Sequence, residues 1–151
     1  MVFRDAFRHK NLFWKFLKYE TNAEYMSGID HLKSNGCNVL GIVCDGRRGL
    51  FRAFEGTPIQ MCHFHQAAII RRYLTSNPKS KAGKELRDIA LILTSVGKEE
   101  FSEMLEGWNY KWKDYISEKS YNEETGKSFF THKRLRSASR SLKTHMPHLF
   151  T

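Results

Sequence analysis

Three side chains of this sequence have the types and the setting for metal or acid–base chemistry. Asp45 ends an apolar run over residues 38–44 and is followed at once by Gly46. A buried parallel strand delivers a carboxylate in this way to the carboxyl edge of an α/β sheet, where sites are usually built. Cys62 and His65 have the Cys-x-x-His spacing, which can hold one zinc ion from two sides. Asp45 is therefore the first candidate metal ligand, and the Cys-x-x-His pair is the second.

Each of these residues also has a structural interpretation. An Asp before a Gly at the end of a strand often caps a helix or closes a turn. A structural zinc site needs four ligands, and no second pair at matching spacing is present, although Cys44 or His63 could come close in space. Cys62 can instead be a buried thiol, and His65 a hydrogen-bonded histidine. The spacing alone leaves both interpretations open.

The composition indicates a basic protein whose partner is a polyanion. The 151 residues carry a formal net charge of +9, and their number fits one domain. Nucleic acid is the first polyanion to consider, and a merely basic protein is the alternative. No apolar run approaches the length of a membrane span, and the three cysteines are an odd number. We therefore expect no membrane, no disulfide framework and a reduced intracellular compartment.

The first part of the chain predicts a hairpin followed by a helix. Aromatic-rich runs over residues 2–7 and 12–19 flank a polar loop of hairpin length, and Asp5 is expected to be structural. Thr21 and Glu24 match a capping box, which begins a helix that closes near Gly36.

Next we expect the strand that ends at Asp45, a short helix over residues 49–54 and a strand from 59 to about 64. Because a helix between two strands is usually a crossover, the strand before Asp45 should lie parallel to a neighbour. The order of these elements is that of the mixed sheet of ribonuclease H-like nucleases.

The second part of the chain predicts helices. One begins at Asn77-Pro78 and ends near Gly97, and another follows with both Trp108 and Trp112 expected in the core. A polar loop covers residues 121–127. The apolar positions that define the two helices are Leu86, Ile89, Ala90 and Leu93, then Phe101, Met104, Leu105, Trp108, Trp112, Tyr115 and Ile116.

A last helical stretch carries many cations and no acid. It keeps a narrow apolar stripe of Leu135, Ala138 and Leu142. The cations can be a solvated face or phosphate contacts, and the overall charge favours phosphate. The cations of this block are Lys127, Lys133, Arg134, Arg136, Arg140 and Lys143, and a second basic edge near Asp45 is expected from Arg47, Arg48, Arg71 and Arg72.

Several segments together resemble prokaryotic insertion-sequence transposases of the Mutator-like DDE type, which have a ribonuclease H-like core. The similarity covers essentially the whole chain, and the pairing of Asp-Gly with Cys-x-x-His is its most specific part. The segments are residues 41–50, 58–66, 69–75, 78–79, 131–138, 141–143 and 149–151.

In that family three acids bind two divalent metal ions. The resemblance places the second acid at Asp45 and the Cys-x-x-His pair at Cys62 and His65. It places the first Asp upstream of Met1 and the final Glu beyond Thr151, so it implies an internal fragment of a transposase with one of three catalytic acids.

The resemblance also implies a fold, a cofactor and a partner. We expect an α/β fold, with an incomplete ribonuclease H-like mixed sheet over residues 1–75 and an all-helical insertion with a basic C-terminal helix over residues 76–151. In the full-length family the cofactor is Mg²⁺ or Mn²⁺, the partners are transposon ends and target DNA, and the protein is a homo-oligomer. The expected location is the cytoplasm of a prokaryote, at the nucleoid.

One carboxylate is too few for two-metal phosphoryl transfer, and a single exposed carboxylate competes poorly with the hydration shell of Mg²⁺. We therefore expect this chain to hold no metal tightly and to be inactive in DNA cleavage and strand transfer by itself. The alternative is a non-enzymatic nucleic-acid-binding module, basic or zinc-stabilised, in which Asp45 is a cap and Cys62 and His65 are structural.

Overall fold

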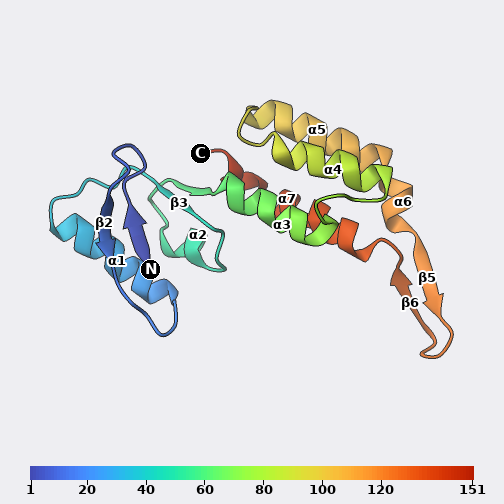
Figure 1. The fold of residues 1–151 in the computed structure, drawn as a ribbon, viewed down its shortest axis with the longest axis horizontal. Coiled ribbons are helices and arrows are strands. Elements are labelled where there is room, and N and C mark those ends of the chain that lie inside the picture. Colours follow the sequence, from blue (N-terminus) through green and yellow to red (C-terminus); the bar gives the residue numbers. More distant parts are fainter. The chain divides into compact units, whose positions relative to one another are not determined.

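The computed structural model describes all 151 residues, which form two compact units, Met1–Gln60 and Met61–Thr151. The chain is of the mixed α/β class, as the sequence predicts. The expected division after residue 75 falls inside the second unit, because the helix before it packs within that unit. No helix is long and apolar enough to cross a membrane. The elements are β1 (Val2–Arg4), β2 (Asn11–Trp14), α1 (Asn22–Ser34), β3 (Ile42–Cys44), α2 (Leu50–Ala53), β4 (Ile59–Met61), α3 (His63–Leu74), α4 (Lys81–Leu91), α5 (Lys98–Lys111), α6 (Lys113–Ser117), β5 (Lys119–Asn122), β6 (Lys127–Phe130) and α7 (Lys133–Leu149) (Figure 1).

The predicted N-terminal hairpin and the helix after it are confirmed. Strand β1 pairs antiparallel with β2, and Phe3 lies opposite Phe13. The Asp5 carboxylate accepts hydrogen bonds from the N–H groups of Phe7 and Arg8, at 2.9 and 3.0 Å, so it closes the turn. The hydroxyl of Thr21 accepts a 3.2 Å hydrogen bond from the N–H of Glu24, which is the N-cap half of a capping box.

The strands of the first unit form two separate pairs, β1–β2 and β3–β4, in place of one mixed sheet. Each strand has only three or four residues, so each ladder is short. Apolar packing joins the pairs instead, because Ile29 and Leu32 of α1 are buried in a core that Phe3, Phe13 and Ile42 also contact. Helix α1 therefore connects two pairs of strands and is not a crossover within one sheet.

The predicted strand over residues 59–64 ends early, at Met61. Cys62 is the N-cap of α3, and His65 lies in the first turns of this helix. A helix forms here in place of a longer strand because Gln66, Ile70 and Leu74 recur every four residues and are buried on one helical face. The expectation that this strand reaches residue 64, and so includes Cys62, is therefore wrong.

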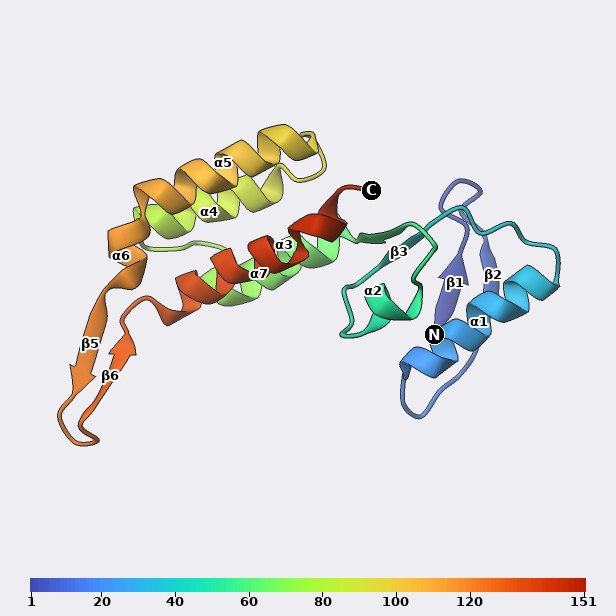
Figure 2. The same ribbon diagram turned by 180° about the vertical axis from the view of Figure 1, so that it is seen from behind.

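Helices dominate the second unit, as predicted. In both views α3 and α7 run antiparallel beside each other, and α4 and α5 form a second layer (Figures 1 and 2). Ile70, Leu86, Phe101 and Leu142 are fully buried between these helices. Helix α4 begins at the cap Ser80, whose hydroxyl accepts a 3.1 Å hydrogen bond from a backbone N–H, and not at Pro78.

The two tryptophans tie α5 and its continuation to α4. Trp108 is buried, and its indole N–H donates to the carbonyl of Ala82 at 3.0 Å. Trp112 is half-buried at the break between α5 and α6, and its indole N–H donates to Glu85 at 2.8 Å. The core position predicted for Trp108 is confirmed, while Trp112 lies at the edge of the core.

An antiparallel hairpin, β5–β6, occupies residues 119–130, where the sequence predicted a polar loop. Phe130 anchors the hairpin on α7. The guanidinium of Arg136 lies 3.6 Å from the centroid of the Phe130 ring and also donates to the carbonyl of Ile116 at 3.0 Å. Arg136, which the sequence placed among the DNA-binding candidates, is thus occupied in holding this hairpin and α6.

The buried stripe of α7 gives a test of the packing. Replacing Leu142 with Ala removes a fully buried side chain and should lower the free energy of unfolding of residues 61–151 by about 2–5 kcal/mol. The neighbouring substitution Lys143→Ala, at an exposed position, should change it by less than about 0.5 kcal/mol. Urea unfolding followed by circular dichroism measures both, and equal effects would contradict the packing of α7.

Candidate nucleic-acid interface

A buried amide joins α3 to α7. Gln66 is fully buried, and its Oε1 accepts a 2.7 Å hydrogen bond from Nδ1–H of His145. Its Nε2 donates to the Ser141 hydroxyl at 3.2 Å. Because all polar atoms of a buried amide need partners, these two bonds fix the rotation of α7 about its axis relative to α3.

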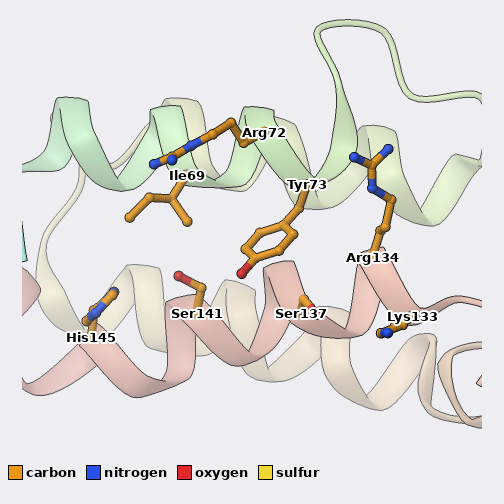
Figure 3. Close-up of a pocket in the computed structure, with 8 residues that line it drawn as sticks. All are labelled: Ile69, Arg72, Tyr73, Lys133, Arg134, Ser137, Ser141 and His145. Carbon is orange, nitrogen blue, oxygen red and sulfur yellow. The ribbon is translucent and has the colours of Figure 1, made fainter. Parts of the chain in front are cut away.

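Beside this bridge the two helices leave an open groove of about 700 Å³ (Figure 3). The Tyr73 ring extends from α3 into the middle of the groove, with Lys133 and Arg134 on one side and Ser141 and His145 on the other. The lining residues are Ile69, Arg72 and Tyr73 from α3 and Lys133, Arg134, Ser137, Ser141 and His145 from α7.

The groove has a positive charge that no acid of the protein balances. Arg72, Lys133 and Arg134 are exposed, and none of them takes part in an ion pair. No carboxylate is among the lining residues. The first turn of α7 also contains no acid and has no side-chain cap, so its N–H groups add to the positive potential. The groove is therefore electrostatically suited to an anion.

The chemistry of the lining fits phosphate in particular. A guanidinium binds a phosphate through two parallel N–H···O bonds, and an ammonium binds it as a point charge. The hydroxyls of Tyr73, Ser137 and Ser141 are neutral hydrogen-bond groups in the same groove. Such a set of side chains can bind a phosphodiester backbone, but it holds no pair of acids that could cleave one.

Of the other predicted basic residues on α3 and α7, Arg71, Arg140 and Lys143 are exposed, whereas Arg47 of the first unit is held by hydrogen bonds. The Arg47 guanidinium donates to the carbonyl of Glu20 and, at 3.3 Å, to the side chain of Asn22. It therefore connects the loop after β3 to the start of α1. Among the other predicted cations, those that are exposed outside the groove and not held in this way are Arg48, Arg71, Lys127, Arg140 and Lys143.

Asp45 lies directly after β3, as predicted, and is exposed. Its carboxylate accepts a 3.1 Å hydrogen bond from the N–H of Arg47, which makes it a turn residue. Burial, the hydrogen bond to Glu20 and the charges of Glu20 and Asp45 raise the pKa of Tyr25 to about 12, against an opposing effect of Arg47. Asp45 and Glu20 thus both lie near enough to the half-buried phenol of Tyr25 to affect it electrostatically.

The Cys-x-x-His pair lies at the start of α3, in the second unit. Cys62 is half-buried, and His65 is exposed with its ring 5.6 Å from that of Phe64. No group of three or more His, Cys, Asp or Glu side chains in the protein is placed to hold one metal ion. Asp45 belongs to the first unit, so neither unit by itself unites the three residues.

Several residues of the site were not identified from the sequence. A polar Gln66 stands on the same helical face as Ile70 and Leu74, and a buried amide at such a position signals a hydrogen-bond partner elsewhere. Tyr73 next to two arginines is the other available signal, since aromatic and basic residues together favour nucleic-acid contacts.

Searches against models of known protein families, curated proteins and solved structures find no match to this chain.

The histidine of the bridge makes the stability of the second unit depend on pH. Burial, together with the charge of His148, lowers the pKa of His145 below its ordinary value of 6.5. The unfolded chain therefore binds a proton more readily at this residue than the folded chain does. The free energy of unfolding should fall as the pH decreases below about 6.5.

His145→Asn, which can keep a donor toward Gln66, should flatten this pH dependence, whereas the exposed control His65→Asn should leave the contribution of His145 in place. Urea unfolding at pH 5, 6 and 7 measures the slopes. A slope that His145→Asn leaves unchanged would show that His145 does not titrate on unfolding.

Proposed function

We propose that this chain is part of a DDE-type transposase and that it contributes DNA binding through the groove between α3 and α7. The observation that carries the proposal is the set of Arg72, Lys133 and Arg134, which lines one groove without any carboxylate. The formal net charge of +9 supports a polyanionic partner.

The transposase assignment rests on the resemblance of the sequence motifs. The order of hairpin, α1, β3 with Asp45, α2 and β4 is consistent with part of a ribonuclease H-like core. In this proposal Asp45 is the second of three acids that hold Mg²⁺ or Mn²⁺ in the full-length enzyme. The other two acids belong to the first strand of that core and to a helix after the helical insertion, and the full-length enzyme acts on DNA as a homo-oligomer.

A second candidate is a basic nucleic-acid-binding module without catalysis. The hydrogen bond from the N–H of Arg47 to Asp45 favours it, because this carboxylate already has a structural role. Both candidates share the groove, and they differ in whether Asp45 binds a divalent metal when the other acids are supplied.

The chain alone should not cut DNA. One exposed carboxylate cannot position two metal ions, so supercoiled plasmid incubated with the chain and Mn²⁺ should stay intact on an agarose gel. Nicking by the native chain that disappears in Asp45→Ala would contradict this prediction and would make the chain an enzyme by itself.

The groove cations should dominate DNA affinity. The triple substitution of Arg72, Lys133 and Arg134 by Ala should weaken binding by at least about tenfold at ~0.1 M salt and reduce the salt slope of log K by about 2–3. Fluorescence anisotropy with a labelled oligonucleotide measures both quantities.

A matched control removes three exposed cations that lie outside the groove, Lys84, Lys98 and Lys113. Because this control changes the net charge by the same amount, it separates a local site from general attraction. Equal losses in the two triple variants would contradict the assignment of the groove.

A further inference from the structure

We propose that the groove between α3 and α7 binds single-stranded DNA, with one unpaired base stacked against Tyr73 and the flanking phosphates on Arg72, Lys133 and Arg134. This inference rests on the proposed function and names the form of DNA that the same groove accepts.

The width of the groove favours a single strand. Helices in direct contact have axes about 8–10 Å apart, and α3 and α7 are joined by buried side chains along their length. A duplex is wider than the space between two such helices, so it can reach only the rim. A single strand is flexible and narrow enough for its bases to enter the groove.

Tyr73 supplies the surface that an unpaired base needs. Tyr73 is 37% exposed although it lies in the middle of the groove, with Lys133 and Arg134 on one side of its ring and the guanidinium of Arg72 on the other (Figure 3). The aliphatic side chain of Ile69 forms part of the same wall. An aromatic ring flanked by cations is typical of single-strand sites, where bases stack on the ring and the backbone follows the charges.

The hydroxyls fit the same ligand. Ser137 and Ser141 lie on α7 across the groove from Tyr73 and can hydrogen-bond to phosphate oxygens or base edges. The Ser141 hydroxyl is fixed by the bond from Gln66, so this part of the floor is already ordered before a ligand arrives. A preordered floor lowers the conformational cost of binding a flexible strand.

The competing geometry is a duplex that receives α7 in its major groove. That groove admits a helix, and the exposed Arg140 and Lys143 of α7 could then contact the two backbones. This arrangement uses the outer face of α7 and leaves Tyr73 without a partner. A substitution of Tyr73 should therefore weaken the binding of a single strand in the groove and leave the binding of a duplex to the outer face of α7 unchanged.

The test compares three labelled ligands of about 12 nucleotides on the full chain by fluorescence anisotropy: oligothymidine, an abasic strand of equal length and charge, and a duplex. Oligothymidine should bind about tenfold more tightly than either of the other two. Tyr73→Leu should lose this preference and bind oligothymidine and the abasic strand equally, because the ring is gone. Tyr73→Phe should keep it, and Tyr110→Leu, at an exposed tyrosine of α5, is the control.

The ligand series gives a result on the native chain, so the test does not depend on the folding of a variant. Duplex binding as tight as that of oligothymidine, or an abasic strand that binds equally well, would overturn the single-strand inference. If the triple substitution of Arg72, Lys133 and Arg134 by Ala still weakens the binding of all three ligands in that case, the proposed DNA-binding function stands. If no ligand depends on the groove cations, the proposed function itself fails.

Discussion

The fully buried amide of Gln66 is the constraint on which the second unit depends. Its two hydrogen bonds, to Ser141 and His145, can form only when α3 and α7 lie antiparallel in one rotational setting. An unsatisfied buried amide would cost roughly 1–3 kcal/mol, so other settings of the helices are disfavoured. The same bonds leave Ser141 and His145 at the floor of the groove, and the packing thereby determines the shape of the site.

Charge and packing act in opposite directions along this pair of helices. Arg72, Lys133 and Arg134 repel one another, and the buried side chains Ile70 and Leu142 keep them together nevertheless. A bound phosphate gains charge-assisted hydrogen bonds and also removes this repulsion. The repulsion among these cations therefore destabilises the unliganded groove, and a bound polyanion relieves it.

The sequence predicts those parts of the fold whose signals are local. Capping residues and apolar spacing indicate α1, α4, α5 and α7. It does not predict α3, because its first turn resembles a ligand motif and its buried face includes the polar Gln66. The β5–β6 hairpin is missed as well, since its short strands lack an apolar alternation and Phe130 is held by Arg136 from α7.

The sequence identifies the basic residues of the site. It does not show which of them are available to a ligand and which are held by contacts within the protein. That division depends on tertiary contacts: Arg136 is held by the hairpin and α6, and Arg47 by the start of α1. The groove itself joins residues 69–73 with residues 133–145, and no local pattern connects them. Long-range packing of two helices is therefore the part of the site that sequence alone does not contain.

We propose that DNA occupies the groove between α3 and α7. A two-dimensional NMR titration of the chain with a short oligothymidine tests it most directly, because amide shifts locate the ligand without any substitution. We expect the largest shifts at Arg72, Tyr73 and Lys133 to Ser137, with little change in residues 1–60. Shifts concentrated around Asp45, or spread evenly over every basic residue, would contradict the account.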